Sequence, residues 1–200
     1  TDQILIGTAP VCDADGPYTA ECGLPVTLDG TGSSDPQNQA LTFSWTGSFT
    51  PSPAIGPTPT VVFGAPAGAK TVSLTVTNTR GETDSCQAVA SVQDTMPPQA
   101  SCNSPTTITP ADAPLSFTAN AEDLCEGELT PVIIDYACYK VTKKGKRIDK
   151  TSSCVVSFSG DTITILDSGG VDTRIEWTTQ TTDGSGNIGA AVCGVQVVKP

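Results

Sequence analysis

The sequence predicts an all-β protein made of two tandem β-sandwiches that disulfides hold together. Three observations lead to this fold class. The 200-residue chain contains 19 Gly and 16 Pro against one Met and no His, and it repeatedly contains short runs of Thr, Val, Ile and Ser. A strand, turn and strand pattern occurs once in each half, and eight cysteines form an even set. Such a composition is typical of short strands joined by tight turns.

The repeated pattern lies at residues 71–92 (TVSLTVTNTRGETDSCQAVASV) and 174–198 (RIEWTTQTTDGSGNIGAAVCGVQVV). In the first copy, Val72, Leu74 and Val76 alternate with polar residues, which is the period of a half-buried strand. A polar turn with Gly follows in both copies, and a Cys comes after the turn. The correspondence predicts two sandwiches of similar construction.

The boundary between the two sandwiches is predicted near Met96. The motif QDTMPP places two prolines there, and prolines prevent a continuous central strand. The openings of the two halves also correspond, because Cys12 and Cys102 each follow a proline by a few residues. The predicted domains are therefore residues 1–95 and 96–200.

The first half resembles a known family. Residues 25–46 (PVTLDGTGSSDPQNQALTFSWT) and 70–85 (KTVSLTVTNTRGETDS) are similar to the PKD domain, an immunoglobulin-like sandwich of prokaryotic surface proteins and secreted enzymes. The turn DGTGSSDP and the strand end WT occur together in this match. The resemblance implies an immunoglobulin-like fold and a non-catalytic spacer or adhesive role.

The second half is similar to a hyalin repeat or another immunoglobulin-like module. The resemblance lies in DTMPPQASC at its start, AEDLC after its second strand and DGSGN before its last strand. A long Lys-rich insertion after Cys138 departs from that pattern. Like the first half, this module is expected to be non-catalytic.

Composition excludes several functions. Without His, neither a Ser-His-Asp triad nor a Cys-His pair can form. A net charge of -11 repels nucleic acid and anionic lipid, and no apolar run reaches the roughly 18 residues of a membrane helix. No two carboxylates stand out as a glycosidase-type pair. We therefore predict no enzymatic activity, no nucleic-acid partner, no membrane insertion, and a soluble chain that is already processed.

Eight cysteines without a CxxC pair or His favour disulfides, which implies an extracellular or cell-surface location. In sandwiches of this class the opening strand commonly runs parallel to the last strand. This topology predicts a bond between Cys12 and Cys86 and another between Cys102 and Cys193.

The remaining four cysteines form two predicted pairs. Cys138 and Cys154 are symmetric about Lys146, within VTKKGKRIDK, so they are expected to be cross-strand neighbours in a hairpin. Cys22 and Cys125 are left, one in each half, and their bond would cross the domain boundary.

Five acidic residues are candidates for a calcium site at the domain junction, because calcium prefers oxygen ligands. They are Asp94, Asp123, Glu126, Glu128 and Asp183. No EF-hand spacing is present, and acidic loops on an acidic protein are usually solvated. The solvated interpretation is favoured, and no other cofactor is predicted.

Six of the ten basic residues lie on the predicted hairpin: Lys140, Lys143, Lys144, Lys146, Arg147 and Lys150. We take Lys143, Lys144, Lys146 and Arg147 as candidate contacts for an acidic protein or a polysaccharide. The alternative is a solvated hairpin whose lysines discourage edge pairing.

Aromatic residues are scarce, so a sugar-stacking platform is poorly supplied. Trp45 and Trp177 are predicted to be core residues. At the amino terminus, Ile4, Leu5 and Ile6 form either an ordinary edge strand or a strand that completes the sheet of a neighbouring subunit.

Together these features predict a non-enzymatic extracellular structural or adhesive protein, with a surface filament joined by amino-terminal strands as its specific form. The alternative is an ancillary carbohydrate- or protein-binding module of a secreted hydrolase.

Overall fold

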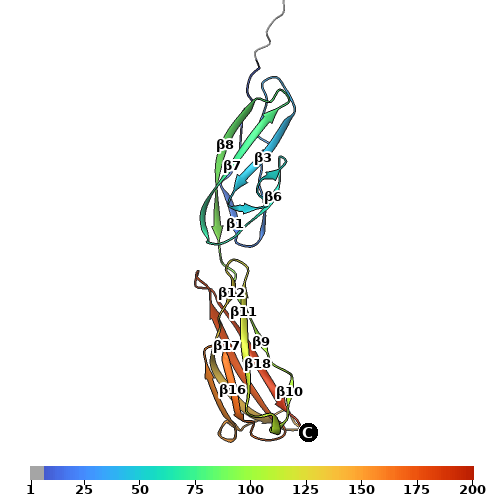
Figure 1. The fold of residues 1–200 in the computed structure, drawn as a ribbon, viewed down its shortest axis with the longest axis vertical. Coiled ribbons are helices and arrows are strands. Elements are labelled where there is room, and N and C mark those ends of the chain that lie inside the picture. The colour runs from blue at the N-terminus through green and yellow to red at the C-terminus, as the bar shows by residue number, and fades with distance from the viewer. Residues whose placement is uncertain (1–6) are drawn as a thin grey trace, which may run out of the picture. The chain divides into compact units, whose positions relative to one another are not determined.

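The computed structural model describes residues 7–200, and its chain divides into two compact units, Thr1–Thr95 and Met96–Pro200. This division falls at the predicted boundary. Both units are β-sandwiches, and the described residues contain strands and two short 3-10 helices (Figure 1). Ile4, Leu5 and Ile6 lie outside the described residues.

The first unit has a five-stranded sheet and a three-stranded sheet. The larger sheet has the order β1-β8-β7-β3-β5, and the smaller one has the order β2-β6-β4. The first and last strands, β1 and β8, pair in parallel, and the other pairs are antiparallel. The strands are β1 (Tyr18–Glu21), β2 (Pro25–Thr27), β3 (Leu41–Gly47), β4 (Phe49–Thr50), β5 (Ala54–Ile55), β6 (Thr60–Phe63), β7 (Gly68–Asn78) and β8 (Thr83–Gln93).

Alternation along the strands builds the core of the first unit. Val72, Leu74 and Val76 on β7 are fully buried, as the sequence pattern predicts. Trp45 on β3 is also fully buried, and its indole nitrogen donates a hydrogen bond to the carbonyl oxygen of Gly56 at 3.0 Å. Because a buried Trp needs a partner for its N–H, this bond fits a core role for Trp45.

The DGTGSSDP turn packs directly over this core. A Cβ atom on Gly30 would lie 2.9 Å from the side chain of Leu74 and 3.0 Å from the ring of Trp45, so the close approach requires glycine. At the other end of the turn, the buried carboxylate of Asp35 accepts a hydrogen bond from the Asn78 amide at 3.1 Å. The motif therefore closes one end of the sandwich.

The second unit has two five-stranded layers. One sheet has the order β10-β18-β17-β13-β14, and the other has the order β12-β11-β16-β15 with β9 on the remaining edge of β11. Strands β10 and β18 pair in parallel. The elements are β9 (Gln99–Asn103), β10 (Thr107–Ile108), η1 (Pro110–Asp112), β11 (Leu115–Asp123), β12 (Gly127–Leu129), β13 (Val132–Val141), β14 (Arg147–Asp149), η2 (Thr151–Ser153), β15 (Val155–Ser159), β16 (Thr162–Asp167), β17 (Thr173–Thr182) and β18 (Ile188–Val197).

The core of the second unit lies between these sheets. Trp177 on β17 is 2 % exposed, which agrees with the predicted core role. Its ring stacks on Phe117 of β11, with the centroids 5.9 Å apart. Ile163 and Ile165 on β16 are fully buried beside them. The contact between Trp177 and Phe117 thus joins the two layers.

Cys12 is bonded to Cys86, and Cys102 is bonded to Cys193, as the sequence predicts. The reason given for the pairing, however, was wrong. Cys102 lies on β9, which pairs antiparallel with β11, whereas the parallel neighbour of β18 is β10. Cys12 similarly precedes β1, the parallel neighbour of β8. The Cys102–Cys193 bond therefore joins the two sheets to each other rather than parallel neighbours within one sheet.

The bond between Cys138 and Cys154 is also present, but not as a cross-strand pair of the hairpin. The β13–β14 pairing runs from Val141 and Arg147 to Tyr139 and Asp149. After that the chain turns through η2, so Cys154 directly precedes β15, which belongs to the opposite sheet. This bond, too, connects the two layers.

Cys22 and Cys125 are disulfide-bonded as well, and no described cysteine is free. The proposal that they bond to each other remains a prediction.

We expect removal of the Cys102–Cys193 bond to destabilise the protein more than removal of the Cys138–Cys154 bond. The closed loops span 91 and 16 residues, for which chain entropy gives about 4.6 and about 3.1 kcal/mol. Urea unfolding of the two double Cys→Ala variants would measure both losses. Equal losses, or a larger loss for the shorter loop, would contradict the expectation.

Candidate functional site

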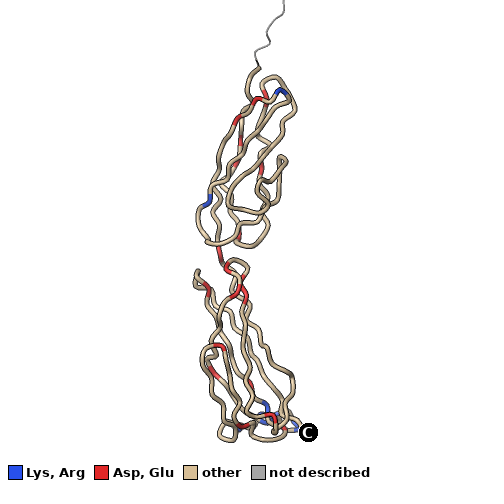
Figure 2. The backbone as a smooth tube through the Cα atoms, in the orientation of Figure 1, with Lys and Arg blue, Asp and Glu red and all other residues tan. Residues whose placement is uncertain are grey.

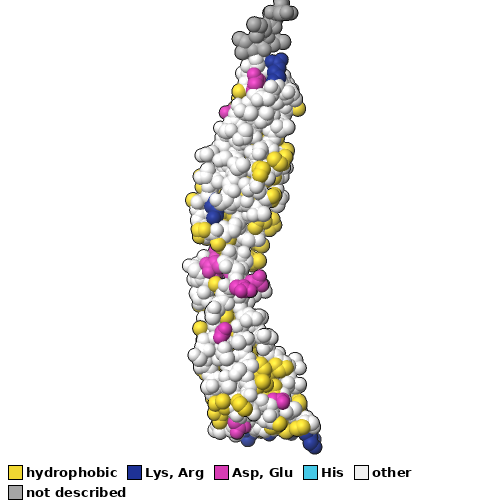
Figure 3. Space-filling view, viewed as in Figure 1, with side chains coloured by type: hydrophobic (Ala, Val, Ile, Leu, Met, Phe, Trp, Pro, Cys, Tyr) yellow, Lys and Arg dark blue, Asp and Glu magenta, His cyan; other side chains and the backbone are white. Residues whose placement is uncertain are grey.

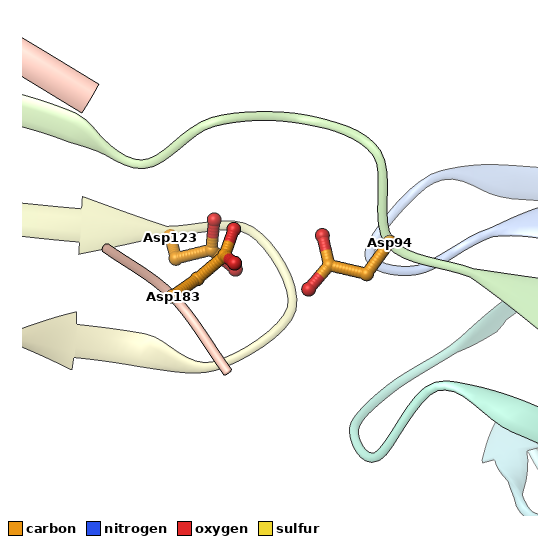
Figure 4. Close-up of side chains that lie close together, drawn as sticks. All are labelled: Asp94, Asp123 and Asp183. Atoms are coloured by element: carbon orange, nitrogen blue, oxygen red, sulfur yellow. The ribbon is translucent and has the colours of Figure 1, made fainter. Parts of the chain in front are cut away.

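Two buried carboxylates lie side by side at one end of the second unit. Asp123 ends β11, and Asp183 follows β17 (Figure 4). Asp123 is 4 % exposed and Asp183 is 6 % exposed. The two residues each offer a carboxylate oxygen, and these oxygens lie within 4.8 Å of each other. Two neighbouring negative charges in a buried place require hydrogen-bond donors or a cation.

Backbone donors satisfy much of this requirement at Asp183. Its Oδ1 accepts hydrogen bonds from the N–H groups of Ser185 at 3.0 Å and Asn187 at 2.8 Å, and its Oδ2 accepts one from the Asn187 amide at 2.9 Å. Burial alone would raise the pKa of Asp183, but these bonds outweigh it and lower the pKa below the ordinary value of 3.8. The carboxylate is therefore ionised and holds the DGSGN turn closed.

Asp123 organises the neighbouring loop in the same way. Its Oδ1 accepts hydrogen bonds from the N–H groups of Cys125 at 2.7 Å and Glu126 at 3.0 Å. Glu126 in turn accepts a bond from the N–H of Gly184 at 2.8 Å, which ties the two acidic loops together. These carboxylates thus have a structural role that explains their position without a metal.

The calcium prediction remains a prediction. Asp123 and Asp183 supply the hard oxygen ligands that calcium prefers, although a full shell needs roughly six to eight oxygens. Glu126 is engaged with Gly184, Glu128 is exposed on β12, and Asp94 belongs to the first unit.

The predicted Lys-rich hairpin is formed by β13 and β14. Gly145 turns its tip with a φ of 78°, and the N–H of Thr142 donates to the carbonyl oxygen of Lys146 at 2.9 Å. In Figure 2 the basic residues of the second unit gather at one end of that unit. Lys143 and Lys144 are exposed at this tip. The turn of the hairpin therefore presents exposed positive charge.

Two of the hairpin cations have partners within the unit. The Lys140 ammonium donates a hydrogen bond to the carbonyl oxygen of Val171 at 2.6 Å. Arg147 lies 4.2 Å from the ring centroid of Tyr139 and forms a 3.5 Å ion pair with Glu176. Arg147 is therefore less available to a partner than the sequence alone suggests.

Glu176 is the centre of a small charge network on the outer face of this sheet. Its Oε1 accepts a 2.8 Å hydrogen bond from Arg174 Nε. Burial would raise the pKa of Glu176, but hydrogen bonds from Arg174 and Tyr139 lower it. Burial also raises the pKa of the Tyr139 hydroxyl, with a further contribution from the Glu176 carboxylate. The network stabilises the base of the hairpin.

An acidic hollow in the first unit was missed by the sequence reasoning. Asp13, Asp15 and Asp29 line a space of about 260 Å³ together with Thr31 and a glycine. Asp13 accepts a bond from the N–H of Asp15, and Asp29 accepts bonds from the N–H and hydroxyl of Thr31, so both are turn residues. The DADG motif was the available signal.

The outer face of the β8-β7-β3 sheet was missed as well, and we call it the hydroxyl face. It consists of cross-strand rows of neutral Ser, Thr and Gln side chains. The rows are Thr42–Thr77–Thr83, Ser44–Thr75–Ser85 and Thr46–Ser73–Gln87. The polar half of the alternating strand pattern was the available signal. These strands carry few charged residues in Figure 2.

Comparison with known families identifies the first unit. Residues 7–93 match the PKD domain family. They form a PKD domain. The match confirms the resemblance seen in the first half and covers nearly all of the first unit. The hyalin-repeat resemblance of the second half remains a prediction, and no curated protein matches the chain.

Solved structures similar to the chain include immunoglobulin-like and fibronectin-like proteins. The insect immune protein hemolin is 11% identical, with 98% of this chain and 48% of hemolin covered and a TM-score of 0.47. Fibronectin(III)-like modules of Clostridium thermocellum CbhA are 13% identical over 94% of each chain, with a TM-score of 0.31. A nucleoside hydrolase-related protein of Saccharophagus degradans is 23% identical over 44% of this chain and 26% of its own, with a TM-score of 0.36.

The chain thus spans about a quarter of the Saccharophagus protein and about half of hemolin. Residues 7–200 include no helix that is long and apolar enough to cross a membrane.

We expect Asp183→Asn to destabilise the second unit at pH 7 and to destabilise it less at a pH well below 3.8. Because the folded pKa of Asp183 is lowered, its stabilising effect is complete above the ordinary value of 3.8 and is lost as the pH falls through the folded pKa. At neutral pH the new amide would place an N–H group against existing donors. Urea unfolding at both pH values measures the difference, and a destabilisation that is independent of pH would contradict it.

Proposed function

We propose that this protein is a non-catalytic extracellular structural or adhesive module. The observation that carries the proposal is that a PKD domain is followed by a second sandwich, and that disulfides join the strands within each unit. Disulfides persist in oxidising compartments outside the cytoplasm. Disulfides also stabilise the folded units against unfolding, which suits a structural or adhesive role.

The specific form that we propose is a filament subunit joined by its amino-terminal strand. The smaller sheet of the first unit ends at β2, and no described strand pairs with the outer edge of that strand. In the second unit the corresponding strand β11 has β9 along this edge. An added strand could therefore extend the sheet at β2 by main-chain hydrogen bonds.

The segment that would supply this strand is residues 1–6, which include Ile4, Leu5 and Ile6. On an extended strand the two isoleucines would share one face, and each would contribute roughly 1.5 to 3 kcal/mol on burial. The chain just after this segment is attached to its own unit, because Thr8 bonds with Gln37 at 3.0 Å and with Asn78 at 3.4 Å. Residues 1–6 could thus reach a neighbour while Thr8 stays in place.

A second candidate function is binding of a neutral polysaccharide, in an accessory module of a secreted hydrolase. The hydroxyl face favours it, because hydroxyl and amide side chains donate and accept hydrogen bonds and can therefore bind sugar hydroxyl groups. The exposed lysines at the hairpin tip, Lys143, Lys144 and Lys146, would suit an acidic polymer or protein instead.

Deletion of residues 1–6 is expected to convert assembled protein into folded monomers, because the added strand would be lost while the Thr8 contacts remain. Electron microscopy and analytical ultracentrifugation would measure assembly, and unfolding curves would verify the fold. Ile4→Lys with Ile6→Lys should act like the deletion, and Leu5→Lys should be milder as the matched control. Filaments of unchanged length after the deletion, or a full chain that never assembles, would exclude the filament.

The polysaccharide alternative predicts that Thr75→Lys with Ser85→Lys weakens binding to an insoluble neutral glucan by an order of magnitude or more, which is about 1.4 kcal/mol. Depletion from solution in the presence of the glucan measures this. Lys143→Ala with Lys144→Ala serves as the control, and equal binding by all variants would contradict a role for the hydroxyl face.

A further inference from the structure

A Pro-rich segment of the first unit displays three unused hydroxyl groups. Residues 50–60 (TPSPAIGPTPT) connect β4 to β6, and in them Thr50, Ser52 and Thr58 each directly precede a proline. All three residues are exposed, and none of their side-chain hydroxyl groups has a hydrogen-bond partner among the described residues. Their hydroxyl groups therefore stabilise nothing within the unit.

The middle of this segment is firmly held. Ala54 is 2 % exposed and lies opposite Trp45 in the β5–β3 pair, and the indole of Trp45 is bonded to the carbonyl oxygen of Gly56. Each proline also fixes its own φ and lacks a backbone N–H. Ser52 and Thr58 consequently lie on stiff exposed bends on either side of β5, and Thr50 lies at the end of β4. An enzyme can reach all three exposed hydroxyl groups.

The chemical surroundings are uncharged. Residues 36–69 contain no Asp, Glu, Lys or Arg, although the whole chain has a net charge of -11. Figure 3 likewise shows side chains without charge over much of the visible face of this unit. Segments rich in Ser, Thr and Pro are typical of O-glycosylated stalks. The chain contains no Asn-X-Ser/Thr sequence for N-linked sugar.

We propose that Thr50, Ser52 and Thr58 are sites of O-linked glycosylation. The donor would be a sugar activated as a nucleotide or lipid diphosphate. The hydroxyl oxygen attacks the anomeric carbon, a glycosidic C–O bond forms, and the bond from that carbon to the phosphate oxygen breaks. The diphosphate leaves with the electron pair, and the hydroxyl proton passes to a base of the transferase. This inference rests on the proposed extracellular location.

The chain contains three other Ser-Pro or Thr-Pro pairs, and we expect these to carry little or no sugar. Ser104 and Thr109 are half-buried, and Thr109 directly precedes the short helix η1, so we expect both to remain unmodified. Thr130 is exposed but stands alone, without the cluster of neighbouring hydroxyl groups. Sugar is therefore expected mainly on residues 50–60.

The test uses the full chain recovered from the medium or cell surface of the organism that produces it. Intact-mass and glycopeptide mass spectrometry should show the mass raised by whole sugar residues, located on residues 50–60. The triple variant Thr50→Val, Ser52→Ala, Thr58→Val should lose most of this added mass. Its melting temperature should match that of an equally unglycosylated wild type, because the three hydroxyl groups bond to nothing.

The matched control replaces three exposed hydroxyl residues of the sheet that do not precede proline: Thr46→Val, Thr83→Val and Ser91→Ala. It should retain the full added mass. An external chain without sugar, or one that keeps its sugar in the first triple variant, would overturn the glycosylation while leaving the proposed function intact. A chain found only inside the cell with reduced cysteines would overturn both.

Discussion

Both units are organised by the alternation of buried and exposed side chains along each strand. Successive side chains point to opposite faces of a sheet, and one face of every sheet must be buried. On β7 this alternation sends Val72, Leu74 and Val76 inward to the buried core, and the residues between them outward. Because those outward residues are Ser and Thr, the sheet acquires a neutral hydroxyl face. Several Asp side chains lie in turns instead, where they accept hydrogen bonds from backbone N–H groups.

The disulfides add a second constraint, since in the second unit they fix the two sheets to each other. Cys102–Cys193 and Cys138–Cys154 each connect opposite layers. A sandwich held in this way resists separation of its two sheets. The loops and strand edges remain outside this reinforcement.

Charged groups in this protein mainly organise structure. Asp183 closes the DGSGN turn, and Glu176 links Arg174 to the base of the hairpin. The surfaces that we propose for partners therefore do not depend on these engaged charges. They are the open edge of β2, the hydroxyl face, the lysines of the hairpin tip, and the Pro-rich segment between β4 and β6. All of them suit binding or covalent attachment without requiring chemistry from the module itself.

The sequence by itself determined the fold class, the unit boundary near Met96 and the buried positions of Trp45 and Trp177, because alternation and proline positions are local properties. It also predicted the correct partners in three disulfides, although the strand arrangements given as the reasons were wrong. The sequence did not determine which strands and sheets the disulfides connect. Which sheet holds Cys102 or Cys154 depends on strand order, and strand order is set by packing between residues far apart in the chain. The engagement of Arg147 by Tyr139 and Glu176, and the open edge of β2, likewise required the tertiary structure, since both depend on which strands become neighbours.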